Sequence, residues 1–277
     1  MSILAGFFLE IMAKGVNEMK VVNRYLLYAS LFIIVLILAG QSYARIDMKT
    51  VEGMWLFDGN TKDSSGKGRD GKIEGKVNWI DGKFGKAISF DGSGYVTIPD
   101  HENPTKAVTL TAWAKSAGPT WNTYGWIIEK RDAFIMHPNA NSKNMAFCVV
   151  NGAPWNQPRT WDAGAVAPDG DLTEWHLYTC TFDSATGKWV IYIDGVAKSS
   201  MDLNKAEIAL DKGPIHIGWD EAGADRKGQG AVDDVAIFNV ALNANDVKEL
   251  MKGLTLGMAV NANGKLATTW SNIKIQP

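Results

Sequence analysis

The sequence predicts an all-β fold, an antiparallel sandwich or barrel, with one short helix near the C-terminus. From residue 52 onward apolar side chains recur at every second position, which is the period of a strand with one buried face. The apolar runs are short and are bounded by Gly, Asp, Pro and Asn, which are turn-forming residues. Residues 45–277 are enough for one all-β domain that does not divide further.

The first 44 residues predict an export signal rather than part of the fold. Lys20 and Arg24 precede an uncharged stretch over residues 25–40, and Ser42 and Ala44 are small residues at positions that a signal peptidase reads. We therefore expect a signal peptide over residues 1–44, starting from Met19, with a secreted or cell-envelope (periplasmic) product. The alternative is an uncleaved anchor, since the stretch approaches the length of a membrane span, and only then would a membrane be a partner.

The strands are expected in the following order. Residues 87–100 alternate on both sides of a Gly-rich turn, and residues 107–115 alternate again. Residues 175–195 predict a β-hairpin with its turn at 184–187, and residues 213–220 predict a further strand. Residues 243–253 predict the helix, with Asn243 or Asn245 as the N-cap and Gly253 as the stop.

Charge and cysteine content narrow the classes of function. The chain carries 28 Lys and Arg against 30 Asp and Glu, so it lacks the clustered positive charge of a nucleic-acid-binding protein. Cys148 and Cys180 both lie in strand-like runs. After export they can form a disulfide or remain two buried thiols, and the sequence leaves both alternatives open.

Several segments, taken in order, resemble one known family. They are "MWLFDGNTKDSSGKGRDGKI" (54–73), "GKFGKAISFDGSGYVTIP" (82–99), "AVTLTAWAK" (107–115), "PIHIGWD" (214–220) and "GAVDDVAIFNVALNANDVKEL" (230–250), together with the hairpin. The chain from about residue 51 to 254 resembles the laminin G-like domains of the concanavalin A-like jelly rolls. The resemblance implies a two-sheet antiparallel jelly-roll sandwich over residues 45–254, with one concave sheet, and leaves residues 255–277 as a tail or a final strand. It also implies recognition of glycans or proteins and, in many members, bound calcium.

Acidic residues in the turns are candidates for a structural calcium site, because calcium takes oxygen ligands from irregular chain. If Val235 and Ile237 face the core, strict alternation sends Asp233 inward as well and leaves Asp234 in solvent. Asp233 then joins the last strand to the first loop, either through calcium or by accepting backbone N–H groups without a metal. The four expected ligands are Asp63, Asp70, Asp91 and Asp233.

Tryptophan is abundant, at 11 residues, and several of these lie in loops beside polar residues. An exposed ring can stack on the apolar face of a sugar while neighbouring amides and guanidinium groups bind its hydroxyls. The alternative is that the rings are buried to order their own loops, and Trp126 in particular is expected in the core. The expected ligand-binding residues are Trp121, Asn122, Tyr124, Trp155, Asn156, Arg159, Trp161 and Trp219.

The sequence does not predict a catalytic site. The Glu-x-Asp-x-Glu pattern of the glucanase branch of this fold is absent, and strict alternation places the adjacent Asp233 and Asp234 on opposite faces. Arg131, Asp132 and His137 form the one combination that fits a lyase. We therefore expect an exported, non-enzymatic module that binds an extracellular glycan or a surface protein. The alternatives are a polysaccharide hydrolase or lyase of the same fold, and a structural subunit of an envelope or filament assembly.

Overall fold

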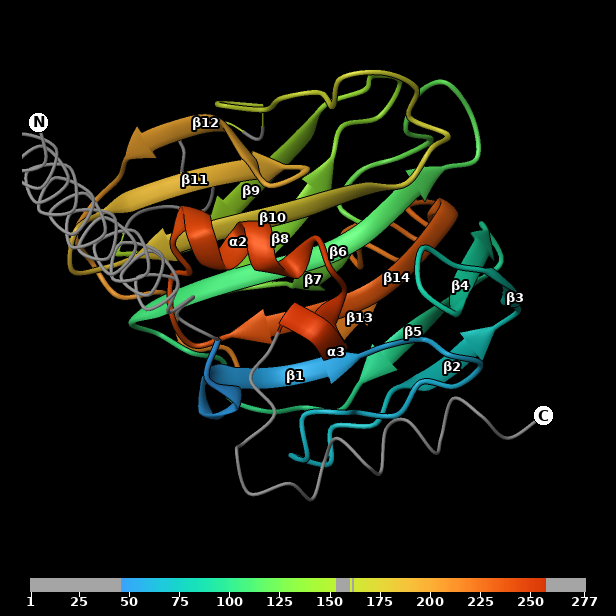
Figure 1. Cartoon of the computed structure of the whole chain (residues 1–277), viewed down its shortest axis with the longest axis horizontal. Helices are drawn as coiled ribbons and strands as arrows, with labels where there is room; N and C mark the ends of the chain where they lie inside the picture. The colour runs from blue at the N-terminus through green and yellow to red at the C-terminus, as the bar shows by residue number, and fades with distance from the viewer. Residues whose placement is uncertain (1–45, 153–159, 161, 258–277) are drawn as a thin grey trace, which may run out of the picture. The chain divides into compact units, whose positions relative to one another are not determined.

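A computed structural model describes residues 46–152, 160 and 162–257. These residues form two antiparallel sheets, which confirms the predicted all-β sandwich (Figure 1). No helix among them is long and apolar enough to span a bilayer. Residues 1–44, for which a signal peptide is predicted, lie outside the described residues. Of the tail or final strand predicted over residues 255–277, residues 258–277 also lie outside them, and residues 255–257 belong to a short helix.

Eight strands form one sheet and six the other. The first sheet has the order β12-β11-β10-β6-β14-β4-β3, with β1 also paired to β14, and the second has the order β2-β5-β13-β7-β8-β9. The strands are β1 (Val51–Trp55), β2 (Lys72–Gly75), β3 (Asn78–Asp81), β4 (Lys86–Asp91), β5 (Gly94–Ile98), β6 (Ala107–Ser116), β7 (Ile128–Lys130), β8 (Phe134–Pro138), β9 (Met145–Val149), β10 (His176–Asp183), β11 (Lys188–Ile193), β12 (Val196–Asp202), β13 (Ile215–Ile217) and β14 (Gln229–Phe238). The helices are η1 (Met48–Thr50), α2 (Ala244–Leu250) and α3 (Leu254–Gly257).

The main core lies between the two sheets. Apolar side chains from every second position of each sheet meet there, as the period of two requires. Trp189 of β11 joins the two layers, because its indole stacks on Phe147 of β9 at 5.8 Å and its Nε1 donates to the carbonyl of Phe147 at 3.0 Å. The predicted hairpin is confirmed, with β10 and β11 paired on either side of the turn at residues 184–187.

A second apolar cluster covers the outer face of the eight-stranded sheet. Trp113, Phe238 and Tyr192 of the sheet form this cluster with Val247 and Leu250 of α2. Figure 1 shows α2 lying over the strands of this sheet. The helix begins where the sequence predicts it. Asn243 is the N-cap, and its side-chain oxygen accepts the N–H groups of residues 245 and 246 in a capping box. This outer face is closed by apolar side chains.

The expected positions of Asp233 and Asp234 are wrong, because β14 contains a bulge. The β14–β6 register shifts between residues 233 and 236, and Asp234 has a φ of 45°. The bulge turns Asp233 to the same face as its cross-strand partner Trp113, away from the core that Val235 enters. Both carboxylates therefore lie on the outer side of the sheet, and Asp234 is buried, at 5% exposure, rather than solvated.

Each of these carboxylates fastens a different segment to β14. Oδ2 of Asp233 accepts the N–H of Phe84 at 2.9 Å, so it holds the β3–β4 turn and not the first loop as predicted. Oδ2 of Asp234 accepts the N–H of Leu254 at 2.9 Å and so holds the start of α3. Burial and the adjacent Asp234 raise the pKa of Asp233 to about 8.

The structure distinguishes between the two alternatives for the cysteines. Cys148 and Cys180 are both free and fully buried. Cys180 lies in the main core, whereas Cys148 lies between Phe147 and Val149, which face that core, and so points to the opposite face of the six-stranded sheet. The structure therefore supports the second alternative, two buried thiols.

Candidate functional site

The outer face of the six-stranded sheet carries charged side chains, whereas the outer face of the eight-stranded sheet carries an apolar cluster. Ile215 and Ile217 of β13 enter the core, so His216 between them points outward. Its cross-strand partner on β7 is Glu129. His216 is 5% exposed and Glu129 is fully buried, which requires each of them to have polar partners.

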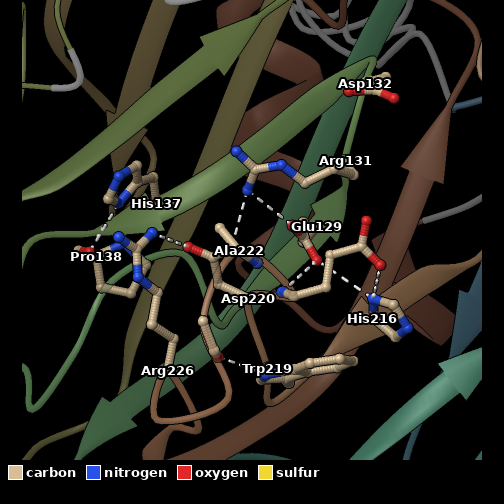
Figure 2. A network of polar contacts seen from close by, with 12 residues as sticks. Glu129, Arg131, Asp132, His137, Pro138, His216, Trp219, Asp220, Ala222 and Arg226 are labelled. Carbon is tan, nitrogen blue, oxygen red and sulfur yellow. Dashed lines mark hydrogen bonds and ion pairs between the residues drawn. The ribbon is translucent and has the colours of Figure 1, made fainter.

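An arginine pairs with the two most deeply buried carboxylates of this face. Nη1 of Arg131 lies 3.1 Å from Oε1 of Glu129 and 2.8 Å from Oδ1 of Asp220. Oδ2 of Asp220 accepts a hydrogen bond from a second guanidinium, with Nη1 of Arg226 at 2.8 Å (Figure 2). Asp220 is only 2% exposed, so the two arginines supply the charge that its burial demands.

Asp220 also shapes the hairpin that connects β13 to β14. This hairpin, residues 218–228, is closed by the Trp219–Lys227 bridge and by the N–H of Gly228 donating to the carbonyl of Gly218. Inside it, Oδ1 of Asp220 accepts the N–H of Ala222 at 2.9 Å. Gly125 lies so close that a Cβ there would be 2.6 Å from Oδ2 of Asp220, and its φ of 66° also favours glycine. The 218–228 hairpin is therefore anchored through one buried carboxylate.

Glu129 meets the same hairpin from the sheet. Its Oε2 accepts the N–H of Glu221 at 3.2 Å and lies 3.2 Å from Nδ1 of His216. The same Nδ1 is 3.6 Å from Oε2 of Glu221. Burial raises the pKa of Glu129, while the hydrogen bonds from His216 and from the Glu221 N–H oppose that shift.

Aromatic rings border the charged network. Trp219 lies 4.6 Å from Tyr95 and 4.8 Å from His216, measured between ring centroids, and both Trp219 and Tyr95 are partly exposed. Tyr124 is 39% exposed, with the guanidinium of Arg226 5.3 Å from its ring centroid. Three rings with accessible surface thus lie along the 218–228 hairpin, beside a cationic side chain.

Three of the predicted ligand-binding residues come together at this hairpin. Tyr124 packs on Arg226, and Trp219 opens the hairpin and donates Nε1–H to the carbonyl of Gly223 at 2.9 Å. Asn122 has a structural role, because its amide donates to the carbonyl of Lys227 and its oxygen accepts the N–H of Gln229. It holds the base of the hairpin against the neighbouring loop.

The prediction of a ligand-stacking role for Trp121 is wrong. Its ring is fully buried in the main core, 5.6 Å from the ring of Trp126 and 6.0 Å from that of Tyr178. Trp126 is fully buried, as expected. The other predicted residues, Trp155, Asn156, Arg159 and Trp161, lie outside the described residues.

Four residues of this network are not predicted as site residues from the sequence: Glu129, His216, Asp220 and Arg226. The signal that was available is a charged or polar residue at the outward position of an otherwise apolar strand, as in "WIIEK" and "PIHIGWD". What the sequence could not show is the β7–β13 register, which brings Glu129 opposite His216. That pairing joins positions 87 residues apart.

The four predicted calcium ligands do not converge on one point. Asp63 accepts backbone N–H groups from residues 54, 65 and 69 and the Ser65 hydroxyl, while Asp70 accepts the Asp63 N–H. Burial acts to raise the pKa of Asp63, but these hydrogen bonds hold it below its ordinary value. Asp91 is exposed and binds Ser93 within the β4–β5 turn. Among the described residues the one group of three potential ligands within reach of a single ion is Glu129, His216 and Glu221.

The combination that fitted a lyase is not assembled. Arg131 pairs with Glu129 and Asp220, and Nδ1 of His137 contacts the carbonyl of Pro138 at 2.8 Å. Asp132 is exposed, and Figure 2 shows its carboxylate pointing away from Glu129. Burial lowers the pKa of His137. The three side chains do not face a common point.

Comparison with known proteins places the chain in a family. The model of the concanavalin A-like lectin/glucanases superfamily matches residues 90–248. The chain belongs to this superfamily. No protein of curated function matches it significantly.

Solved structures share the fold at low sequence identity. Domain 4 of AbnA, a GH43 extracellular arabinanase from Geobacillus stearothermophilus, in complex with arabinotriose, has a TM-score of 0.54 and 21% identity, over 73% of this chain and 98% of that one. The binding domain of botulinum neurotoxin DC, solved with rat synaptotagmin II, has a TM-score of 0.56 and 15% identity, over 76% of this chain and 52% of that one. The same binding domain in complex with SialylT has a TM-score of 0.57 and 16% identity, over 75% and 52%. The chain thus spans about half the length of the toxin domains.

Proposed function

We propose that the chain is an exported, non-enzymatic module that binds an extracellular glycan at the 218–228 hairpin on the outer face of the six-stranded sheet. The observation that carries the proposal is the set of three partly exposed rings, Tyr95, Tyr124 and Trp219, beside the guanidinium of Arg226. Flat rings bury the apolar faces of sugars, and tyrosine and tryptophan add a polar group at the rim. Partly exposed rings that are already held in place lose little conformational entropy on binding.

The rigidity of the hairpin supports recognition at this place. Its aromatic residues are fixed by the buried Asp220 carboxylate, which two guanidinium groups neutralise. Binding surfaces whose side chains are locked by packing and by supporting hydrogen bonds hold their ligands with less ordering cost. The fold neighbours include a domain solved with arabinotriose and a toxin domain solved with SialylT, which agrees with a sugar ligand. A surface protein is the alternative ligand, because the same toxin domain was solved with synaptotagmin II.

The two buried carboxylates of this face favour binding over hydrolysis. A glycosidase needs two carboxyl groups that flank the scissile bond, one of them free to protonate the leaving oxygen. Glu129 is fully buried and both its oxygens accept hydrogen bonds. Asp220 is 2% exposed and holds two arginines. Neither group can reach a glycosidic oxygen without breaking the network that anchors the hairpin.

Affinity electrophoresis in polysaccharide gels, followed by calorimetry with the best oligosaccharide, tests the proposal. Trp219→Ala and Tyr124→Ala should each weaken binding about fivefold or more, since loss of a stacking ring costs roughly 1 kcal/mol or above. Trp175→Ala is the matched control, because this partly buried indole belongs to the apolar cluster on the opposite sheet. It should leave binding unchanged.

Two results would overturn the proposal. Retarded migration that persists in Trp219→Ala and Tyr124→Ala would remove the ring platform. Release of reducing ends or unsaturated sugars from any bound polysaccharide would show an enzyme.

Calcium is part of the proposal and has its own test. We infer that an ion, if bound, has a structural role at the 58–71 loop, where Asp63 and Asp70 lie together. Calcium should then raise the melting temperature and a calcium chelator should lower it, because a ligand that binds only the folded state stabilises it. An unchanged melting temperature in both conditions would show that the hydrogen bonds of Asp63 hold the loop unaided.

A further inference from the structure

Three potential metal ligands converge on the outer face of the six-stranded sheet. Glu129 comes from β7, His216 from β13 and Glu221 from the 218–228 hairpin, and one ligand atom from each lies within 4.8 Å of the others. The three residues are buried, buried and exposed, in that order. A bound ion would therefore touch solvent on one side, which provides an entry path and open coordination positions.

The distances in this group differ from those of an ordinary histidine–carboxylate ion pair. Nδ1 of His176 lies 2.7 Å from Oδ2 of Asp194, which is a charge-assisted hydrogen bond. Nδ1 of His216 is instead 3.2 Å from Glu129 and 3.6 Å from Glu221, so it is shared between two carboxylates at longer range. Ligands held at about 2.1 Å around a tetrahedral ion are separated by about 3.4 Å. The two separations lie on either side of that value.

Negative charges outnumber positive ones around the group, which favours binding of a cation. Glu129, Asp220 and Glu221 carry three negative charges, and Arg131 and Arg226 carry two positive ones. With a neutral His216, the state required of a metal ligand, one negative charge is uncompensated. A carboxylate as buried as Glu129 needs a cationic partner or a proton.

We propose that Glu129, His216 and Glu221 bind one divalent transition-metal ion, of which Zn²⁺ is the best fit. An imidazole nitrogen with two carboxylates suits Zn²⁺, whereas Ca²⁺ takes oxygen ligands only. The supporting contacts are in place, because Arg131 binds the other oxygen of Glu129 and the Glu221 N–H binds Oε2. Such hydrogen bonds orient a carboxylate toward its metal.

The ion would connect two strands of the sheet to the 218–228 hairpin. The hairpin carries Trp219, whose ring lies 4.8 Å from that of His216. Metal binding would therefore hold the ring in position against the sheet. This inference goes beyond the proposed function, and it is measured without any glycan present, so that its failure and the failure of glycan binding are distinguishable.

Calorimetric titration of the metal-free protein with ZnCl₂, MnCl₂ and CaCl₂, each alone, tests the site. We expect one Zn²⁺ per chain that added CaCl₂ does not displace, because the calcium proposed above binds at the 58–71 loop, and visible absorption from Co²⁺ bound in place of Zn²⁺. Glu221→Gln should weaken Zn²⁺ binding about tenfold or more. This variant keeps the backbone N–H that Glu129 accepts, and the side chain it changes is exposed.

Asp225→Asn is the matched control, because Asp225 is an exposed carboxylate of the same hairpin outside the group of three. It should bind Zn²⁺ as the unmodified protein does. Absence of Zn²⁺ binding, or equal binding by Glu221→Gln and Asp225→Asn, would overturn the proposal. The three side chains would then form a metal-free cluster in which His216 lies between two glutamates.

Discussion

The two outer faces of the sandwich are built on the same period-two strands but are covered in opposite ways. On the eight-stranded sheet, Trp113 and Phe238 lie under Val247 and Leu250 of α2 in an apolar cluster. On the six-stranded sheet, Glu129 lies against the 218–228 hairpin, and Asp220 of that hairpin pairs with Arg131 and Arg226. The first face loses its water to apolar packing, whereas the second keeps charged groups buried and aromatic rings partly exposed.

The apolar cover of one outer face contributes mainly to stability, whereas the charged network of the other holds a fixed geometry. Apolar burial stabilises the fold at roughly 25 cal/mol per Å² and needs no exact partner. A buried ion-pair network contributes little net stability compared with apolar side chains of similar size, yet it is costly to break and holds one geometry. Carboxylates occur on both faces, but Asp233 and Asp234 accept backbone N–H groups that fasten the chain, while Glu129 and Asp220 pair with side chains.

Removing an aromatic ring from each face should give the largest contrast. Phe238 is fully buried, so Phe238→Ala should lower the free energy of unfolding by about 4 kcal/mol through lost burial and a cavity. Tyr124 is 39% exposed, and Tyr124→Ala should cost less than about 1 kcal/mol. Urea denaturation measures both values. Equal costs would mean that the hairpin face is as important to stability as the helix-covered one.

Breaking the ion network should have the next largest effect. Arg131→Ala leaves Glu129 and Asp220 buried with less compensating charge, and should lower the free energy of unfolding by about 3 kcal/mol. The guanidinium is itself partly exposed, so the value falls at the lower end for buried pairs. Thermal and urea denaturation provide the measurement.

Lys212→Ala is the control for charge alone, because Lys212 and its partner Glu102 are both mostly exposed. Its effect should lie within the error of the measurement, since exposed pairs contribute little. A comparable loss in the two variants would contradict a special role for the buried network.

Removing the ion pair between His176 and Asp194 on the eight-stranded sheet should have the smallest effect on the free energy of unfolding, and that effect should depend on pH. The hydrogen bond that His176 donates to Asp194 raises the pKa of His176, so the stabilisation it provides is complete below the ordinary pKa of about 6.5 and is lost as pH rises through the raised value. Burial acts to raise the pKa of Asp194, but His176 holds it below its ordinary value of about 3.9, so that contribution is lost as pH falls through the lowered value. The pair therefore stabilises most between about pH 4 and 6.5.

Asp194→Asn tests this pair without disturbing the turn. Asp194 and Gly195 have φ of 52° and 75°, the type I′ geometry that Asn-Gly adopts well. The amide oxygen of asparagine can still accept the Leu177 N–H. The difference in stability from the unmodified protein should be about 0.5 kcal/mol at pH 5.5 and should shrink by pH 8. A difference that does not change with pH would show that the pair carries no charge.

Features that depend on neighbouring residues, such as caps and turns, were predictable from the sequence, and contacts between distant segments were not. The helix cap at Asn243 and the turn at residues 184–187 depend on a few neighbouring residues, and both are where the sequence indicates. The burial of Trp121 was missed because a loop tryptophan has the same sequence context whether its ring faces solvent or the core. The Asp233 prediction was wrong because it assumed unbroken alternation, which the bulge at Asp234 ends.

The sequence by itself determined the class of the fold, several of its strands, the turn at residues 184–187 and the helix that begins after Asn243. These follow from a period of two, from turn-forming residues and from capping, all of which act over a few positions. Only the tertiary structure decided which carboxylates meet which partners. Strand register and the bulge set those contacts. They placed Glu129 beside His216 and turned Asp233 away from the core. Register depends on pairing between strands far apart in the chain, so no local pattern contains it.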